Sequence, residues 1–250
     1  MARKRTGIIL AWDRDTFKSK DVDLLDSLME HVDMVKVGLR AMNRFDPAFG
    51  ASIAECVRSW MSEKREKTVM WDAKFFDIGT TVDKAIRDIV NRADNIRFLT
   101  VHATMSDNAL HLANTSCAQA NVTALAVTVL TDIDEAQCRL RFGRSPPDAV
   151  AHLARNAQKQ GIRGFVCSPL EIRILRETLG HDAVLVVPGV RPAWALTNDQ
   201  KRVAAPAEAA KAGADYIVVG RPILEPPSGM TPVESAKRVR EVLDEALATA

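Results

Sequence analysis

The sequence predicts a single (β/α)8 barrel, and two observations support this prediction. Eight short runs rich in β-branched and apolar residues recur along the 250 residues, and amphipathic segments with helical spacing separate them. This alternation, in a chain of about 250 residues, has the order and size of a (β/α)8 barrel. An open doubly wound sheet is the competing layout. Because no segment rich in Gly, Ser and Pro marks a boundary, we predict one domain over residues 1–250.

The predicted strands are short apolar runs, as expected for parallel strands that are buried on both faces. In chain order they are 7–13, 33–39, 68–75, 98–103, 124–130, 164–169, 183–190 and 216–223. Apolar residues recur every three or four positions in the helical segments 21–32, 54–65, 82–93, 148–161 and 206–215. Gly161 and Gly213 lie where two of these helices should end, because glycine readily adopts the left-handed conformation that closes a helix.

The composition is typical of a soluble globular protein. With a net charge of +2 and 26% charged residues, the chain gives no reason to expect nucleic acid or an anionic membrane as a partner. No apolar run approaches the ~20 residues that a membrane helix needs. Charged residues at 13–15 interrupt the N-terminal apolar run, so no signal peptide is predicted. We expect a cytoplasmic protein.

Motifs for metals and common cofactors are absent from the sequence. The four cysteines make no C-x-x-C pair, and the five histidines make no H-E-x-x-H motif. Free thiols in a reducing compartment are therefore expected, not a zinc site or a disulfide framework. No G-x-G-x-x-G or G-x-x-x-x-G-K-[ST] stretch is present. We therefore predict no metal and no cofactor.

Polar side chains gather at the ends of the predicted strands, where barrel enzymes carry their active sites. In strand order they are Asp13, Lys36, Asp72 with Lys74, His102, Thr131, Arg191, and Gly220 with Arg221. Side chains alternate along a strand, so Asp72 and Lys74 should share one face. Lys36 is predicted on the adjacent strand facing the same interior, and Asp77 adds a second carboxylate. A catalytic network and a structural ion-pair network both fit this pattern.

Arg191 and Arg221 follow the predicted seventh and eighth strands, where barrels commonly hold a phosphate. Gly220 would let backbone N–H groups approach the anion, and each guanidinium could clamp it with two hydrogen bonds. Salt bridges on the rim are the alternative interpretation of both arginines. The long irregular segment 191–203 is predicted to be a lid loop, with an ordinary surface excursion as its alternative.

Seven short motifs, in barrel order, resemble the orotidine 5'-phosphate decarboxylase family from about Ile8 to about Ala236. They are VKVG (35–38), DAKFFDIGTTV (72–82), VTVLT (127–131), VCS (166–168), PGVRP (188–192), DQKRV (199–203) and VGRPI (219–223). The resemblance implies decarboxylation of orotidine 5'-monophosphate (OMP) to UMP, the last step of de novo pyrimidine nucleotide synthesis. It also implies that the reaction needs no cofactor.

The resemblance implies a role for each matching position. Asp13 and Lys36 would hold the ribose hydroxyls, and Lys36 would also join the charged network. Asp72 would lie against the substrate carboxylate, and Lys74 would deliver a proton to C6. Asp77 and Thr81 would reach into the site of a neighbouring subunit, which makes a homodimer the working unit. The remaining substrate contacts would be Thr131 at the pyrimidine and Arg191, Gln200, Gly220 and Arg221 at the 5'-phosphate, with Gln200 on the lid.

Some positions depart from the commonest pattern of the family. Phe76, Gly79 and Thr80 stand where His, Pro and Asn are usual, which leaves the path after Asp77 open. None of these changes removes a charged catalytic group. His102 matches a family histidine, and we expect it to be a hydrogen-bonded structural residue.

Two other functions compete with this interpretation. Mg²⁺-dependent sugar-phosphate lyases of the same suprafamily, of the 3-keto-L-gulonate 6-phosphate decarboxylase or hexulose-6-phosphate synthase type, share the D-x-K-x-x-D motif. They carry Glu where this chain has Lys36, and a cation there would repel the metal. A catalytically silent barrel that only binds a ligand would be expected to have lost one of Asp72, Lys74 or Asp77.

Overall fold

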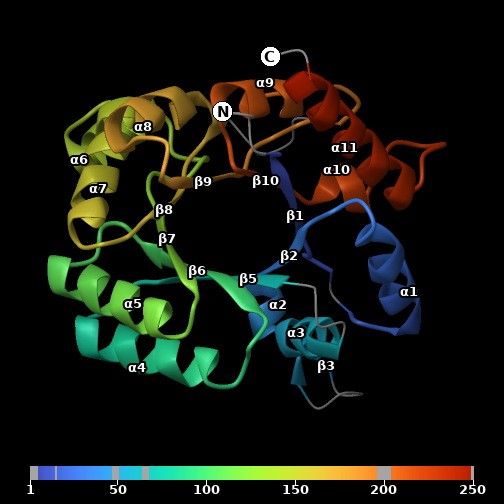
Figure 1. Ribbon diagram of the computed structural model, residues 1–250, viewed down its shortest axis with the longest axis horizontal. Coiled ribbons are helices and arrows are strands. Elements are labelled where there is room, and N and C mark those ends of the chain that lie inside the picture. The colour runs from blue at the N-terminus through green and yellow to red at the C-terminus, as the bar shows by residue number, and fades with distance from the viewer. Residues whose placement is uncertain (1–4, 15, 47–50, 64–67, 196–203, 249–250) are drawn as a thin grey trace.

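The computed structural model describes residues 5–14, 16–46, 51–63, 68–195 and 204–248. Eight parallel strands form a closed barrel in the order β1-β10-β9-β8-β7-β6-β5-β2 (Figure 1). They are β1 (Gly7–Ala11), β2 (Met34–Gly38), β5 (Thr68–Phe75), β6 (Ile96–His102), β7 (Thr123–Val127), β8 (Gly164–Val166), β9 (Val184–Val187) and β10 (Tyr216–Val219). Because β1 pairs with both β2 and β10, the barrel is confirmed and the open doubly wound sheet is wrong.

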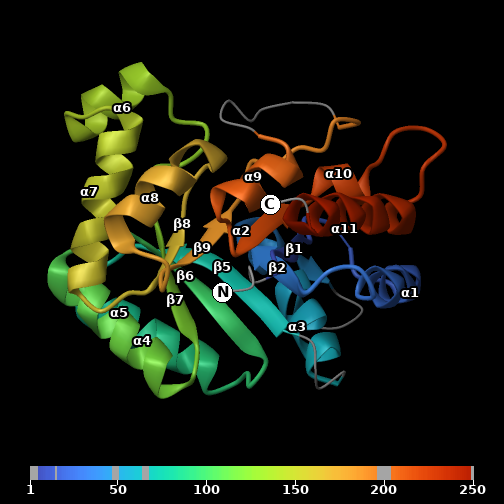
Figure 2. The ribbon, with the colours of Figure 1, turned by 45° about the horizontal axis from the view of Figure 1, so that its top comes forward.

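Helices surround the barrel as an outer ring (Figure 1). They are α1 (Ser19–Leu28), α2 (Leu39–Asn43), α3 (Ile53–Glu63), α4 (Gly79–Val90), α5 (Asp107–Gln119), α6 (Glu135–Phe142), α7 (Pro146–Lys159), α8 (Ile172–Leu179), α9 (Pro206–Ala212), α10 (Arg221–Leu224) and α11 (Pro232–Ala248), with a 3-10 helix at Pro169–Glu171. A small antiparallel pair, β3 (Phe45–Asp46) and β4 (Ala51–Ser52), lies outside the barrel. The helix α6 projects beyond the ring (Figure 2). No helix in the described ranges is long and apolar enough to span a membrane.

Local sequence signals set the ends of several helices. Each of the five predicted helical segments overlaps a helix, and α9 ends at Ala212, immediately before Gly213. Gly213 has φ of 106° and Gly161, just after α7, has φ of 94°, so both glycines adopt the predicted left-handed conformation. Ser106 and Ser145 cap α5 and α7 by accepting a hydrogen bond from the backbone N–H three residues later.

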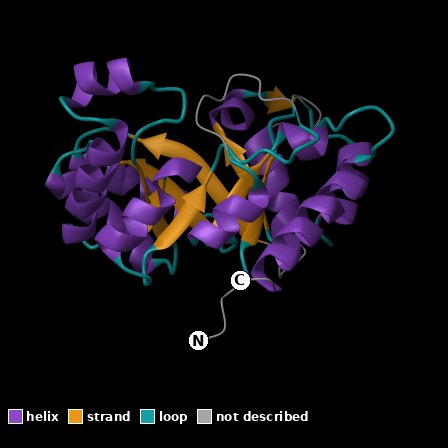
Figure 3. Ribbon diagram, turned by 90° about the horizontal axis from the view of Figure 1, so that it is seen from above, coloured by secondary structure: helices purple, strands orange, loops and turns teal. Residues whose placement is uncertain are grey.

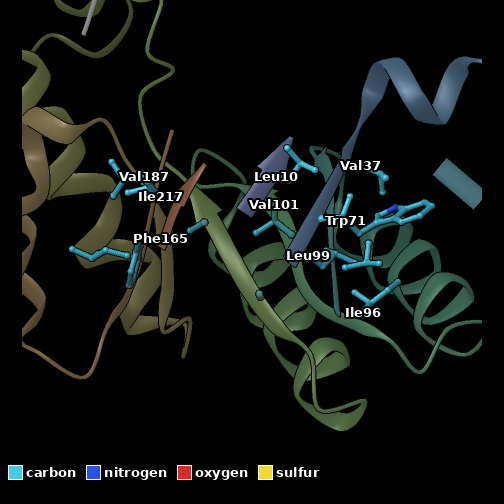
Figure 4. Packing of buried hydrophobic residues seen from close by; sticks show 14 of the residues in the cluster. Leu10, Val37, Trp71, Ile96, Leu99, Val101, Phe165, Val187 and Ile217 are labelled. Carbon is cyan, nitrogen blue, oxygen red and sulfur yellow. The ribbon is translucent and has the colours of Figure 1, made fainter. Parts of the chain in front are cut away.

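Two apolar layers form the core, and the strands separate them. The outer layer packs between strands and helices and includes Leu10, Val37, Trp71 and Leu99 (Figure 4). The inner layer fills the barrel with Ile9, Ala11, Met34, Met70, Phe98, Leu125, Val127, Val166, Val186 and Val218. Seen from above, the strands lie between the flanking helices (Figure 3). The alternation of Met70 and Trp71 between these layers confirms that Asp72 faces the barrel interior.

Several strands end earlier than the sequence predicted. β1 ends at Ala11, β9 at Val187 and β10 at Val219, and β7 and β8 are also shorter than predicted. Proline explains the end of β9, because Pro188 has no N–H to continue the ladder of hydrogen bonds, and β10 ends because Gly220 already caps the helix α10. Three predicted site residues, Asp13, Thr131 and Arg191, consequently lie on loops at the rim, and Arg221 is the first residue of α10.

Candidate active site

A cavity of about 270 Å³ opens at the carboxyl ends of the strands. Its apolar floor belongs to the inner core layer and includes Met70, Val127 and Val218. Its polar lining contains eight predicted site residues, namely Asp13, Lys36, Asp72, Lys74, Thr131, Arg191, Gly220 and Arg221. Barrel closure therefore brings together residues that are far apart in the sequence, as the strand-end pattern predicted.

Asp72 stands between two ammonium groups at the centre of this lining. Lys74 Nζ lies 2.8 Å from Asp72 Oδ1 and 2.9 Å from Oδ2. Lys36 Nζ lies 3.2 Å from Asp72 Oδ2 and 4.0 Å from Asp13 Oδ1. Asp72 is buried, whereas the side chain of Lys74 is 31% exposed toward the cavity. We call Lys36, Asp72 and Lys74 the charged row.

The two lysines keep Asp72 ionised although it is buried. Burial by itself raises the pKa of the carboxyl group, because the charged form loses its hydration. The charges of Lys36 and Lys74, with hydrogen bonds from Lys74 and Thr100, act in the opposite direction and leave the pKa of Asp72 below its ordinary value. The row therefore holds two positive charges around one negative charge, and an excess of positive charge faces the cavity.

The backbone at Lys74 has an unusual conformation that aims its side chain. Lys74 has φ of 48°, in the left-handed region that non-glycine residues seldom occupy. The pairing of β5 with β6 shifts here: Trp71 pairs with Leu99 and Phe75 with Val101, so three residues of β5 lie opposite a single residue of β6. A non-glycine residue in such a conformation costs about 1–2 kcal/mol.

The single residue opposite this bulge is Thr100, which the sequence motifs did not single out. Its Oγ1 accepts a hydrogen bond from the Lys74 N–H at 2.9 Å and donates one to Asp72 Oδ1 at 3.0 Å. Thr100 is completely buried. One signal could have revealed it: in FLTVH (98–102) Phe98 faces the interior, so Thr100 is a polar residue that points into the barrel.

His102 lies at the end of the same strand but is not part of the cavity lining. Its Nδ1 is 2.7 Å from Thr104 Oγ1, and its ring packs edge-on against Phe76 with centroids 5.6 Å apart. Burial, followed by the charge of Lys74, lowers the pKa of His102, so the ring is neutral at pH 7. These contacts fit the structural role expected for this histidine.

Asp77 and Thr81 lie outside the cavity of their own chain. Both are exposed, and Asp77 Oδ1 accepts a hydrogen bond from the Ile78 N–H at 2.7 Å. Beside them, Phe76 and Ile78 expose 64% and 70% of their surface. One chain thus assembles three of the four predicted catalytic residues, and the fourth points to solvent.

Close packing accounts for the departure from the family pattern at Gly79. A Cβ atom at this position would lie 2.8 Å from Asn108 Nδ2 and 3.0 Å from Leu112 Cδ1, where α4 packs against α5. The turn after Asp77 therefore begins α4 directly against its neighbouring helix.

Three residues predicted to bind phosphate meet on the opposite side of the cavity. Arg191 and Arg221 both line it, and the Arg191 N–H donates to Ala204 O at 2.9 Å, which joins the two ends of the predicted lid. Gln200 and most of the lid, 196–203, lie outside the described residues. Gly220 touches β1: a Cβ there would lie 3.1 Å from Ala11 Cβ and 3.3 Å from Ala11 O.

Known proteins are similar to this chain in both sequence and architecture. The Heliobacterium modesticaldum orotidine 5'-phosphate decarboxylase is 37% identical over 96% of this chain and 97% of its own length. The enzyme of the same name from a Nostoc species is 40% identical over 86% of this chain and 89% of its own length. The crystal structure of orotidine 5'-phosphate decarboxylase from Lactobacillus acidophilus superposes with a TM-score of 0.69 and 27% identity, covering 98% of this chain and 99% of that one.

The similarity extends over the whole barrel, from before the first strand into the last helix. Residues 6–239 match the orotidine 5'-phosphate decarboxylase / HUMPS family, and this range contains the charged row and both rim arginines. The chain therefore belongs to the orotidine 5'-phosphate decarboxylase / HUMPS family.

Proposed function

We propose that this protein decarboxylates OMP to UMP, the last step of de novo pyrimidine nucleotide synthesis. The observation that carries the proposal is the charged row, with Lys74 Nζ held 2.8 Å from a buried carboxylate in a cavity that has an apolar floor. The relatives that share this architecture are named for the same reaction.

The chemistry needs a fixed positive charge close to the reacting carbon. Loss of CO₂ from C6 of OMP leaves an electron pair in the plane of the ring, where no enolate-type resonance can absorb it. We infer that Lys74 stabilises this electron pair as CO₂ leaves. The same lysine then donates a proton to C6. Preorganised charges of this kind often supply the largest share of catalysis, because they do not have to reorient during the reaction.

Asp72 has two effects in this scheme. It aims the ammonium group of Lys74, because its carboxylate lies 2.8 Å from Nζ and attracts the positive charge. It also places a negative charge beside the substrate carboxylate, which weakens substrate binding. Lys36, 3.2 Å from Asp72 and 4.0 Å from Asp13, would bind the ribose hydroxyls together with Asp13.

Binding energy from the distant phosphate can compensate for this repulsion, since contacts remote from the reacting bond can stabilise an otherwise unfavourable arrangement at the centre. We assign the 5'-phosphate to Arg191, Gln200, Gly220 and Arg221, and the pyrimidine to Thr131. The arginines and Thr131 line the same cavity as the charged row, which supports this assignment. Closure of the 191–203 lid would exclude water from the site.

A homodimer would complete the site. Asp77 and Thr81 lie outside their own cavity, next to the exposed apolar side chains Phe76 and Ile78. A surface of this kind is suited to contact a second copy, and a two-fold axis would let each chain supply Asp77 to its partner.

The four cysteines are buried thiols, which supports a cytoplasmic location.

The magnesium-dependent lyase is the weaker alternative. Its metal would have to sit beside Asp72, where Lys36 and Lys74 already place two ammonium groups within 3.2 Å. Positive charges at this distance repel a divalent cation. We therefore expect turnover of OMP to be unchanged in EDTA, and a loss of turnover in EDTA would favour the lyase.

The direct test is the loss of OMP absorbance in the presence of chelator, with Lys74→Ala as the comparison. The variant should still fold, because Lys36 remains 3.2 Å from Asp72 and continues to balance its charge, and it should lose at least about 10³-fold in kcat. Normal turnover by Lys74→Ala, or none by the wild type, would contradict the proposed function.

Mixing two inactive variants tests the shared site. In a hybrid of Lys74→Ala with Asp77→Asn, one of the two sites combines an intact Lys74 with an intact Asp77 from the other chain. Random exchange of equal amounts makes half of the dimers hybrid, so about a quarter of wild-type activity should return. No recovery after verified exchange would show that Asp77 acts within its own chain.

A further inference from the structure

Thr100 is the polar residue closest to the charged row that the proposed reaction leaves without a role. It is completely buried in β6, and its hydroxyl oxygen lies 3.0 Å from Asp72 Oδ1. Buried hydroxyl groups usually bond to the backbone of the same or a neighbouring strand. This hydroxyl bonds to the strained Lys74 backbone on the neighbouring strand and, in addition, to a catalytic carboxylate.

The direction of each hydrogen bond follows from the groups involved. A backbone N–H can only donate, so the hydroxyl oxygen accepts from Lys74 N at 2.9 Å. The single hydroxyl proton is then available for Asp72, whose ionised carboxylate can only accept. Thr100 thus has both of its polar functions engaged by the two residues of the D-x-K motif.

The same contact replaces a strand hydrogen bond that the bulge removes. Between the pairs Trp71–Leu99 and Phe75–Val101, Thr100 is the only residue of β6 opposite three residues of β5. Lys74, at φ of 48°, directs its N–H to this hydroxyl instead of to a ladder carbonyl. Without the hydroxyl, the buried N–H would lose its acceptor and the left-handed conformation its support.

We propose that Thr100 is a positioning residue for decarboxylation: its hydroxyl fixes the backbone bulge at Lys74 and the carboxylate of Asp72 in one geometry, so that the lysine ammonium reaches C6. The inference rests on the proposed function for its catalytic part. Thr100 itself touches neither the substrate nor the cavity surface, because it lies beneath Asp72 and is not exposed.

Thr100→Val tests the role of the hydroxyl, since valine keeps the branched shape and removes only the polar atom. We expect kcat for OMP to fall at least about tenfold while KM changes less than about threefold, because ground-state contacts to ribose and phosphate remain. Thr100→Ser retains the hydroxyl and should restore kcat to within about threefold of wild type. If the valine variant fails to fold, Thr100→Ala removes the same hydroxyl under the same criterion.

Thr128→Val is the matched control. Thr128 is also a completely buried threonine, directly after β7, but its hydroxyl donates to the Val166 carbonyl oxygen at 2.8 Å and does not contact the row. Thr128→Val should lower the free energy of unfolding and leave kcat within about threefold of wild type. A smaller than tenfold loss in Thr100→Val, an equal loss in Thr128→Val, or no recovery in Thr100→Ser would each overturn the proposal.

A crystal structure of Thr100→Val separates this inference from the proposed function. We expect Lys74 to leave the left-handed conformation, or its Nζ to move beyond hydrogen-bond distance of Asp72. An unaltered charged row would overturn the positioning role whatever the activity. A wild-type protein without OMP decarboxylation would refute the proposed function, and the structure of the variant would still decide whether Thr100 sets the geometry of the row.

Discussion

Replacing Asp72 by asparagine should destabilise the protein and abolish turnover, and the stability effect can be worked out from the structure. The substitution keeps the shape of the side chain and removes the one negative charge between two ammonium groups. Lys74 Nζ lies 2.8 Å and Lys36 Nζ 3.2 Å from the carboxylate. Both lysines would then face each other without the anion that holds them together.

The magnitude is set by two opposing terms. At about 3 Å and an effective dielectric constant of about 20, each lysine attracts the carboxylate by about 5 kcal/mol. Desolvation of the buried ions offsets much of this attraction, and removal of one partner from a buried pair costs about 3–5 kcal/mol. Because Lys74 is 31% exposed and can turn toward water, we expect the lower end, about 3 kcal/mol. For a domain of this size the melting temperature should fall by about 6–12 °C.

The effect should depend on pH in a defined direction. The pKa of Asp72 in the folded protein lies below its ordinary value of 3.8, so its charge stabilises the fold fully above that value. This stabilisation disappears as the pH falls through the lowered pKa, where the folded protein also takes up the proton. The asparagine side chain of the variant does not titrate. The difference in unfolding free energy between wild type and variant should be constant above about pH 4 and shrink below it.

Urea unfolding of the ligand-free protein, followed by circular dichroism from about pH 3 to 8, measures this difference across the pKa of the carboxyl group. Asp13→Asn is the matched control, because Asp13 is 49% exposed and makes only a 4.0 Å contact with Lys36. It should cost no more than about 1 kcal/mol. If Asp72→Asn were as stable as wild type, or if both substitutions cost the same, the view that Asp72 holds two cations together would be refuted.

Two further substitutions test the rim of the site. Arg221→Ala should lower kcat/KM for OMP by at least about 10²-fold and leave turnover of phosphate-free orotidine within about threefold, because only the phosphate contact is lost; equal effects on both substrates would contradict the phosphate assignment. Gly220→Ala should cost about 1–3 kcal/mol in urea unfolding, because its Cβ would lie 3.1 Å from Ala11 Cβ. A wild-type urea midpoint would show that β1 can move away from the added methyl group at little cost.

Much of the fold follows from periodicity. Each barrel strand is a short apolar run, and the five predicted helical segments show a repeating apolar face, so the number and order of the barrel strands could be predicted from the sequence. The ends of the strands were predicted less well. The predicted first strand included Asp13, for example, but the strand β1 ends at Ala11. The predicted convergence of Lys36, Asp72 and Lys74 is confirmed because alternation on paired parallel strands leaves little freedom.

The supporting geometry could not be predicted in the same way. D-x-K on an ideal strand places both side chains on one face, but the left-handed backbone at Lys74 and its hydrogen bond to Thr100 belong to a bulge that an ideal strand lacks. A bulge depends on the register of two strands, and its two partners here, Lys74 and Thr100, are 26 residues apart, so no local pattern encodes it. The position of Asp77 likewise depends on a turn that starts a helix against α5.

The charged row is stable only in the form that the proposed reaction uses. A buried carboxylate without cations would take up a proton, and removal of the carboxylate would leave two ammonium groups facing each other, so each charge stabilises the others. The backbone strain at Lys74, about 1–2 kcal/mol, is small beside the electrostatic attraction within the charged row. The barrel that pairs β5 with β6 can sustain this strain. An arriving substrate carboxylate would add a second negative charge beside Asp72, which Lys74 can relieve only by turning toward the substrate. Loss of CO₂ would remove that charge and leave Lys74 next to the new carbanion, so the same lysine can serve both stages without moving far.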